Sequence, residues 1–293
     1  MLSLSLSKGT LREAKFCTKL APTHSIKPHI QMKKHLKLLL ITLVTLAGIA
    51  AMQAPRPTLY IIGDSTVRNG SGKGTDGLWG WGSLIPAHFD TTRIHIENHA
   101  IGGRSSRTFL TEGRWDKIMA RLAPGDFVIM QFGHNDGGAI NDTTRARGSI
   151  KGMGDETQEI DNMLTRKHEI VHSFGWYMKK YIADTKSKGA TPIVCSLVPR
   201  NVWKEGKVER GSNSYGKWAA ESATAGNAFY IDLNEIIARK YEAGYDEAKL
   251  KTDFFPGDHT HTNYAGAKFN AAAVVEGIQQ LKGCKLNQYV VKL

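Results

Sequence analysis

Residues 59–66 read Leu-Tyr-Ile-Ile-Gly-Asp-Ser-Thr, an apolar run of strand length that is followed directly by a glycine and polar side chains. Residues 127–136 repeat the arrangement, because Phe-Val-Ile-Met-Gln-Phe precedes Gly-His-Asn-Asp. Runs without regular apolar–polar alternation are typical of strands buried on both faces, as in a parallel sheet covered by helices. The two stretches therefore predict a buried parallel sheet with polar residues where its strands end.

The rest of the chain extends this pattern into alternating strands and helices. Further runs of strand length occur at Ile94–Ile96, Ile193–Val198 and Ala228–Ile231. Helical patterns lie between and after them, at Trp115–Leu122, Ile160–Lys188, Leu233–Tyr241 and Tyr264–Leu281. Such alternation predicts an α/β fold, namely a three-layer α/β/α sandwich with a parallel sheet.

The composition is that of a globular protein, apart from its N-terminal segment. The 293 residues are 41% hydrophobic and 23% charged, which excludes collagen-like, disordered and multi-spanning membrane classes. Three lysines among residues 33–37 precede an apolar run over 38–52 that contains small residues. This pattern predicts a secretory signal peptide over 32–54, a periplasmic or extracellular protein, and no membrane contact beyond that segment. We interpret residues 1–31 as an over-extended N-terminus and residues 55–293 as one α/β domain.

Removal of the N-terminal segment changes the charge and the cysteine content. Residues 1–54 hold eight of the 39 basic and one of the 27 acidic residues, so the net charge falls from +12 to +5. A charge this small gives little reason to expect a nucleic-acid partner. Cys195 and Cys284 then remain. Export permits a disulfide between them, while the apolar surroundings of Cys195 favour a buried free thiol, and both possibilities stay open.

Three side chains after the predicted strands have the chemistry of an activated nucleophile. Ser65 follows a strand and a glycine, so a tight turn there would expose its hydroxyl. A serine attacks only when a base takes its proton, and His261 is the candidate base. An imidazole needs a partner that fixes its tautomer, which Asp258 can provide from three residues earlier.

The same region supplies donors for a developing oxyanion. A glycine N–H can approach a ligand closely because no Cβ intervenes, which makes Gly103 a candidate. The N–H of Ser65 and the side-chain amide of Asn135 are two further candidates. These residues predict acyl transfer at the carboxyl edge of the sheet, where ligands of such folds gather.

Taken together, the blocks Gly63-Asp64-Ser65, Gly103, Asn135 and Asp258-x-x-His261 resemble the SGNH (GDSL) hydrolase superfamily. Within it the chain is most similar to rhamnogalacturonan acetylesterases, through residues 103–105, 133–138 and 258–262, and the likeness runs from about residue 58 to 278. The resemblance implies that the domain over 55–293 is a single hydrolase domain with a flavodoxin-like sheet. It also implies a catalytic Ser65, His261 and Asp258, an oxyanion hole of Ser65, Gly103 and Asn135, and no cofactor or metal.

The resemblance further implies a function. It indicates a secreted serine esterase that removes acetyl groups from a pectic, rhamnogalacturonan-like polysaccharide or oligosaccharide. Two alternatives keep the fold: an esterase for another acetylated glycan or a lipid, and a carbohydrate-binding protein without turnover.

A third alternative is a zinc hydrolase. His168-Glu169-Ile170-Val171-His172 matches the His-Glu-x-x-His signature and lies within the predicted helix over Ile160–Lys188. On a helix, histidines four apart would face one side. However, the further histidine that one branch of this family needs is replaced by Met178.

The sequence leaves open the roles of two groups of residues near the predicted site. Trp79 and Trp81 would either stack on sugar rings or pack against the first helix. Several arginines follow strand ends and would either meet carboxylates of an acidic polysaccharide or lie in solvent; they are Arg104, Arg107, Arg145, Arg147, Arg200 and Arg210.

Overall fold

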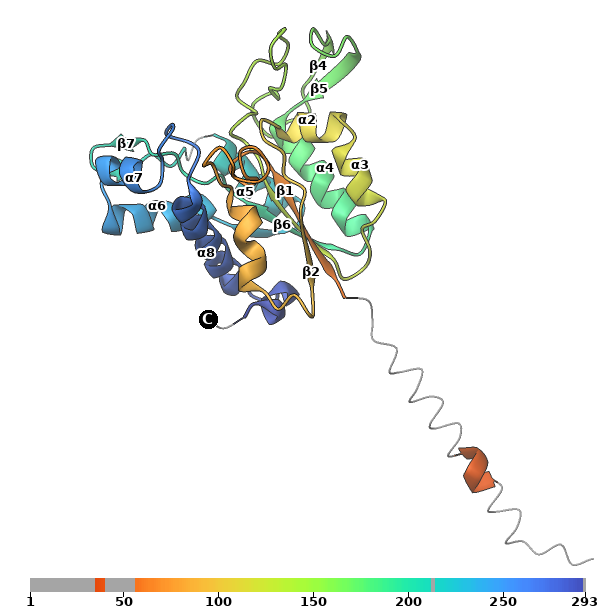
Figure 1. Ribbon diagram of the computed structural model, residues 1–293. Coiled ribbons are helices and arrows are strands. Elements are labelled where there is room, and N and C mark those ends of the chain that lie inside the picture. The colour runs from red at the N-terminus through yellow and green to blue at the C-terminus, as the bar shows by residue number, and fades with distance from the viewer. Residues whose placement is uncertain (1–34, 40–55, 212–213, 292–293) are drawn as a thin grey trace, which may run out of the picture. The chain divides into compact units, whose positions relative to one another are not determined.

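The computed structural model describes residues 35–39, 56–211 and 214–291, and a five-stranded parallel sheet is its central element (Figure 1). The strands are β1 (Thr58–Gly63), β2 (His95–Asn98), β3 (Phe127–Gln131), β6 (Thr191–Cys195) and β9 (Phe229–Ile231). They pair in the order β2-β1-β3-β6-β9, and all four pairings are parallel. When the five strands of this sheet are numbered by their order in the chain, they have the 2-1-3-4-5 order of flavodoxin-like folds. The predicted fold class is confirmed.

Strand β1 shows why its sequence is apolar throughout. Leu59 and Ile61 belong to one hydrophobic core, whereas Tyr60 and Ile62 belong to a second core. All four side chains are at most 2% exposed. Because successive side chains of a strand point to opposite faces, the two cores lie on the two sides of the sheet.

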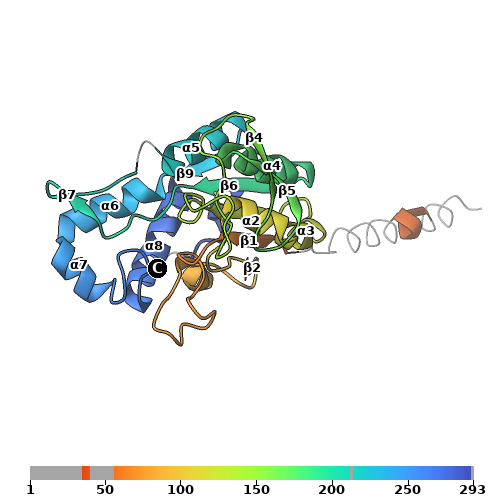
Figure 2. The same cartoon turned by 90° about the horizontal axis from the view of Figure 1, so that it is seen from above.

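Helices cover both faces of the sheet (Figures 1 and 2). The core that contains Leu59 is completed by residues of η1 (Trp81–His88), α6 (Leu233–Gly244), α7 (Glu247–Asp253), α8 (Tyr264–Gln280) and η2 (Lys285–Tyr289). The core that contains Tyr60 is completed by α2 (Ser106–Thr111), α3 (Arg114–Met119), α4 (Phe174–Ser187) and α5 (Tyr215–Ala225). The helices predicted over 115–122, 233–241 and 264–281 are thus present as α3, α6 and α8.

The helix predicted over Ile160–Lys188 is wrong in its first half. Residues Thr157–Asp161 (β4) and His168–His172 (β5) form an antiparallel hairpin instead. Only Ile160 and Val171 of the hairpin are buried, so no apolar periodicity marks it as two strands. Another hairpin, of strands two residues long, follows β6; it consists of β7 (Trp203–Lys204) and β8 (Lys207–Val208).

The true start of α4 has a clear local cause. Ser173 is its N-cap, and the Ser173 hydroxyl accepts a hydrogen bond from the Trp176 N–H at 3.0 Å. Such a cap satisfies one of the amide groups that the first turn of a helix leaves without a partner. The helix therefore begins at Phe174, after the hairpin has ended.

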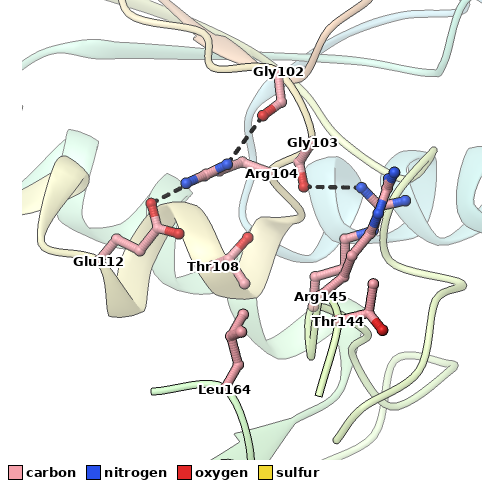
Figure 3. A pocket seen from close by; sticks show the side chains of 9 residues that line it. Gly102, Gly103, Arg104, Thr108, Glu112, Thr144, Arg145 and Leu164 are labelled. Carbon is pink, nitrogen blue, oxygen red and sulfur yellow. Dashed lines mark hydrogen bonds and ion pairs between the residues drawn. The ribbon is translucent and has the colours of Figure 1, made fainter. Parts of the chain in front are cut away.

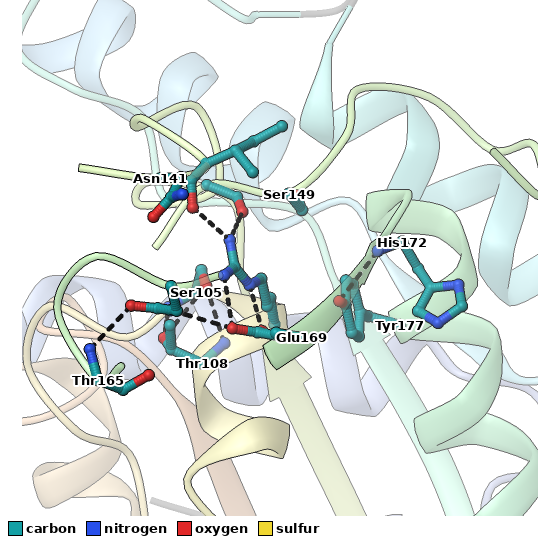
Figure 4. A network of polar contacts seen from close by, with 12 residues as sticks. Ser105, Thr108, Asn141, Ser149, Thr165, Glu169, His172 and Tyr177 are labelled. Atoms are coloured by element: carbon teal, nitrogen blue, oxygen red, sulfur yellow. Dashed lines mark hydrogen bonds and ion pairs between the residues drawn. The ribbon is translucent and has the colours of Figure 1, made fainter. Parts of the chain in front are cut away.

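A buried ion pair fixes the hairpin to α2 (Figure 4). The Arg107 side chain is fully buried, and its Nε and Nη2 donate to the Glu169 carboxylate on β5 at 2.6 and 2.7 Å. Its Nη1 donates to the carbonyls of Ile140 and Gly148 at 2.7 and 2.8 Å. Asn162 donates a further hydrogen bond to Glu169 at 3.0 Å. One guanidinium thus joins α2, the loop after β3 and the hairpin.

The described residues fall into two units, of which Arg56–Leu293 is one. In the other unit, residues 35–39 are helical. Apart from these five residues, the signal peptide predicted over 32–54 and the over-extended N-terminus over 1–31 lie outside the described residues. In the described part of the chain, no helix combines the length and apolar character needed to cross a bilayer.

Both described cysteines are buried free thiols, which decides between the two possibilities left open by the sequence. Cys195 is the last residue of β6 and packs in the core that contains Leu59. Burial raises the pKa of its thiol to about 12, so the reactive thiolate is scarce at neutral pH.

Candidate active site

The turn after β1 places Ser65 at the carboxyl edge of the sheet. The Asp64 carbonyl accepts from the N–H groups of Val67 and Arg68 at 3.2 and 3.0 Å, which closes the turn. The Asp64 carboxylate is buried, and its Oδ1 accepts from the N–H and hydroxyl of Thr66 at 2.9 and 2.8 Å. Gln131, at the end of β3, donates to the same Thr66 hydroxyl at 2.6 Å. The serine therefore sits on a rigid support.

Gly63 is required by the closeness of this turn to the neighbouring strand. A Cβ at this position would lie 2.6 Å from Val67 Cγ2 and 2.7 Å from the Gln131 carbonyl oxygen. Neither distance is compatible with a side chain. The glycine before the Asp-Ser pair is thus explained by close packing against Val67 of the turn and against β3.

His261 is held by a loop that precedes α8. The Oδ1 of Asp258 accepts from the N–H groups of Thr260 and His261 at 2.6 and 2.7 Å, which closes a turn around the carboxylate. The Trp79 N–H donates to the Thr262 carbonyl at 2.8 Å, and the Thr262 hydroxyl donates to the Trp79 carbonyl at 3.0 Å. The loop is thereby tied to the segment that follows the Ser65 turn.

These two segments bring three of the predicted side chains into one hydrogen-bonded chain. Ser65 Oγ lies 2.8 Å from His261 Nε2, although the residues are 196 positions apart in the sequence. His261 Nδ1 lies 2.7 Å from Asp258 Oδ2. Burial opposes ionisation of Asp258, but hydrogen bonds from the His261 ring and from two backbone N–H groups outweigh it and lower its pKa to about 2. An ionised carboxylate only accepts, so Nδ1 carries the ring proton and Nε2 accepts from Ser65.

Two of the predicted oxyanion donors lie on or beside the loop over residues 102–104, close to this serine. Gly103 has φ +76°, a left-handed conformation that favours glycine. A Cβ built on the adjacent Gly102 would lie 3.8 Å from Ser65 Cβ, so this loop passes close to the serine. Among the described residues, the backbone N–H groups of Ser65 and Gly103 find no acceptor. Two unpaired donors beside a nucleophile are what a tetrahedral intermediate requires.

Asn135 lies beside the same loop. Its Nδ2 donates to the Arg104 carbonyl at 3.0 Å, and the residue is 6% exposed. An amide nitrogen has two hydrogens, so one remains for a further acceptor. The structure thus joins Ser65, His261 and Asp258 by hydrogen bonds, and it ties the Asn135 amide to the loop that contains Gly103.

The sequence interpretation did not single out Asp136, which supports the loops around the site. This carboxylate is fully buried and accepts from the Ser106 N–H and hydroxyl at 3.1 and 2.5 Å and from the Ser149 hydroxyl at 3.1 Å. Burial raises its pKa to about 6 against the opposing effect of these hydrogen bonds. An acidic residue within five positions of the end of an apolar strand was the signal that could have identified it.

Replacing Asp136 with asparagine is expected to change how stability depends on pH. From the reference value of 3.8 up to the folded pKa of about 6, the folded protein binds more protons than the unfolded chain. The free energy of unfolding therefore falls as pH rises through this window. The variant lacks this contribution, so its deficit relative to wild type should be larger at pH 4.5 than at pH 7, as measured by urea unfolding. Asp155→Asn, at an 86% exposed side chain, is the control; equal deficits at both pH values would contradict the prediction.

Two cavities are lined by the loops that carry Gly103 and Asn135. One, of about 420 Å³, is lined by Gly102, Gly103 and Arg147 among others, and Leu164 from the β4–β5 connection faces it from the opposite side (Figure 3). The second, of about 450 Å³, is lined by His134, Arg147 and Arg200 among others. Arg147 belongs to both.

The two tryptophans near the site differ in role. Trp81 is completely buried, and its Nε1 donates to Gln131 Oε1 at 2.9 Å, so it is a packing residue. Trp79 is half-buried, and its ring meets that of Tyr264 edge-on with 5.1 Å between the ring centroids. Through its backbone it also holds the His261 loop, as described above.

The zinc alternative loses its structural basis. The segment from His168 to His172 is strand β5 rather than a helix, so the two histidines are about 13 Å apart at about 3.3 Å per residue. Glu169 accepts from Arg107, and His172 stacks on Trp176 with 3.7 Å between the ring centroids. Within the described residues, no group of three or more His, Cys, Asp or Glu side chains could hold a metal ion.

The chain is similar in sequence to several known proteins. Residues 61–269 match the model of the GDSL-like lipase/acylhydrolase family. The chain is 33% identical over 236 residues to the rhamnogalacturonan acetylesterase of Emericella nidulans, covering 80% of this chain and 89% of that one. It is 32% identical over 241 residues to the probable rhamnogalacturonan acetylesterase YesY of Bacillus subtilis, covering 80% and 97%.

A solved structure shares the fold. The crystal structure of YxiM from Bacillus subtilis superposes with a TM-score of 0.62 at 25% identity, covering 78% of this chain and 58% of that one. Two relatives above 30% identity and a family match over more than half of the residues define the class of this chain. The chain belongs to the GDSL-like lipase/acylhydrolase family, and it is a carboxylic ester hydrolase.

Proposed function

We propose that this protein is a secreted serine esterase that removes acetyl groups from an acetylated pectic polysaccharide of the rhamnogalacturonan type. The observation that carries the serine mechanism is the chain of contacts from Ser65 Oγ through His261 to Asp258, with distances of 2.8 and 2.7 Å. The pectic substrate is supported by the two relatives at 32–33% identity. Ser65, His261 and Asp258 are the proposed catalytic residues.

In the first half of the reaction, Ser65 Oγ attacks the carbonyl carbon of the acetyl ester while His261 Nε2 takes the hydroxyl proton. The resulting imidazolium is stabilised by the Asp258 carboxylate at Nδ1. The tetrahedral intermediate then collapses, the bond to the sugar oxygen breaks, and Nε2 returns its proton to that oxygen. The products of this half are a free sugar hydroxyl and an acetylated Ser65.

In the second half, water replaces the sugar. His261 Nε2 takes a proton from the water as its oxygen attacks the acetyl carbon of the acyl-enzyme. The second tetrahedral intermediate expels Ser65 Oγ, which regains the proton from Nε2. Acetic acid leaves, and the enzyme returns to its starting state without any cofactor.

In both halves the carbonyl oxygen acquires negative charge. The N–H groups of Ser65 and Gly103 and the second N–H of the Asn135 side chain are the proposed donors. They are fixed before the reaction, since the Asn135 amide is anchored on the Arg104 carbonyl and Gly103 by its turn. Donors that need no rearrangement stabilise the transition state most effectively.

Export is supported by the basic and apolar pattern over residues 32–54. If the segment is a cleaved signal peptide, the mature protein begins near residue 55 and is found outside the cytoplasm. N-terminal sequencing of the protein recovered from culture medium or periplasm tests this. A protein that retains residues 32–54 in the cytoplasm would contradict export while leaving the esterase activity unaffected.

The substrate is tested by measuring acetate release from acetylated rhamnogalacturonan, acetylated xylan and a short-chain lipid ester under identical conditions. We expect the highest kcat/KM on rhamnogalacturonan. A preference for xylan or lipid would refute the pectic substrate and keep the esterase mechanism. Addition of a metal chelator should leave all three rates unchanged, because no proposed step involves a metal.

A further inference from the structure

The arginines that line the two cavities are not equivalent. Arg104 Nε donates to Glu112 at 3.0 Å, and Arg210 pairs with both Glu235 and Glu242. Within the described residues, the other three arginines on the cavity walls have no carboxylate within 4.0 Å; these are Arg145, Arg147 and Arg200. Among the described residues, these three arginines therefore line the cavities without a direct ion pair.

Of these three arginines, Arg147 is the best placed to bind an anionic ligand. It is half-buried between the two cavities, and its Nη1 donates to the Gly103 carbonyl at 3.2 Å. A guanidinium has five N–H donors, so most of them remain for a ligand. Burial and the nearby charge of Arg145 lower its pKa, although a guanidinium stays charged at neutral pH. A half-buried cation of this kind is stabilised by an anion that enters the cavity.

The backbone is shaped to hold these two arginines in place. Ala146, between them, has φ +37° and is 2% exposed, a conformation that costs a non-glycine residue free energy. Asp142 Oδ1 accepts from three consecutive N–H groups, those of Thr144, Arg145 and Ala146, at 2.9, 2.6 and 2.8 Å. The surroundings thus impose a tight turn, and Arg145 also lines the cavity that contains Gly103 (Figure 3).

We propose that Arg147, assisted by Arg145, binds the carboxylate of a uronic acid residue in the substrate and so places a nearby acetyl ester against Ser65. This rests on the proposed pectic function, and it assigns the acidic sugar to the side of the nucleophile where Gly103 lies. The planar fork of a guanidinium matches a carboxylate with two parallel hydrogen bonds, which is geometrically selective. Because Arg147 touches the Gly103 carbonyl, a bound carboxylate is held next to the proposed oxyanion donor.

The experiment tests enzyme variants on two forms of the substrate. Acetylated rhamnogalacturonan oligosaccharides are prepared with free carboxylates and, separately, with the carboxylates methyl-esterified. Acetate release gives kcat/KM for wild type, Arg147→Gln and Arg145→Gln on both forms. We expect wild type to prefer the free acid about tenfold, the effect of one charge-assisted pair, and Arg147→Gln to lose this preference. Arg145→Gln, at an exposed side chain, should reduce the preference about threefold.

The preference is the ratio of kcat/KM on the two substrate forms. A smaller fraction of active enzyme in a variant lowers both values equally and leaves this ratio unchanged. Arg239→Gln is the matched control, since Arg239 is 75% exposed on α6 and paired with Glu235; it should leave the preference intact. An unchanged preference in both Arg147→Gln and Arg145→Gln, or equal activity of wild type on both substrate forms, would overturn the proposal. If wild type releases no acetate from either form, the pectic function itself fails, which is a separate outcome.

Discussion

Ser65→Ala is expected to lower turnover of an acetyl ester by about 10⁴–10⁶-fold, with the folded structure unchanged. The variant removes the oxygen that is proposed to form the acyl-enzyme, so the two-step route is lost. Residual activity would come from the oxyanion donors and His261, which still polarise the ester and activate water. The substitution removes one oxygen from a part-buried turn whose other hydrogen bonds come from Asp64 and Thr66, so stability should be preserved.

Turnover of 4-nitrophenyl acetate, with thermal unfolding recorded in parallel, measures this effect. His261→Ala should show a loss of similar size, because a serine without its base is not a nucleophile. Asn135→Ala should lose about 10²–10³-fold, the usual effect of one oxyanion donor. Near wild-type turnover in Ser65→Ala or His261→Ala would refute the serine mechanism. A loss of turnover below about threefold in Asn135→Ala would show that Asn135 is a turn residue and not an oxyanion donor.

Arg107→Met is expected to lower the free energy of unfolding by about 3–5 kcal/mol, the range found when one partner of a buried ion pair is removed. Arg107 is fully buried, and the Glu169 side chain is 14% exposed, so the remaining carboxylate has little access to water. The carbonyls of Ile140 and Gly148 also lose their donor. The loss should appear in the hairpin and in the loop after β3, which this guanidinium joins.

Urea unfolding measures the global effect, and limited proteolysis locates it. Arg114→Met is the control, because Arg114 pairs with Glu112 at the surface of α3 and should cost less than about 1 kcal/mol. Adding Glu169→Leu to Arg107→Met should recover part of the loss, since it removes the uncompensated charge. A loss in Arg107→Met no larger than that of the control would show that the buried pair does not hold the hairpin.

Much of the sheet and of the site was predictable because local sequence carries the signal. Strands buried on both faces need continuous apolar runs, and β1 and β3 have them. Polar residues directly after such runs must lie at the carboxyl edge of a parallel sheet. Ser65 and Asn135 therefore follow from their positions after β1 and β3 alone.

The β4–β5 hairpin was not predictable on this basis. Its burial pattern has one buried residue in each strand, so neither a helical nor an alternating period is present. What fixes it is the pairing of Glu169 with Arg107, 62 positions away in the sequence. A contact between charges that are distant in the chain produces no periodic pattern in the sequence. The prediction of a helix over residues 160–188 was wrong in its first half for this reason.

The amino-acid sequence by itself determined the parallel sheet, its two apolar faces and the chemistry available at its edge, because these depend on which side chains follow one another. Only the tertiary structure decided that His261 Nε2 comes within 2.8 Å of Ser65 Oγ and that Arg147 donates to the Gly103 carbonyl with no direct ion pair among the described residues. Both depend on how loops from separate strands pack over one edge, and packing between distant segments is set by the three-dimensional fold rather than by neighbours in the chain.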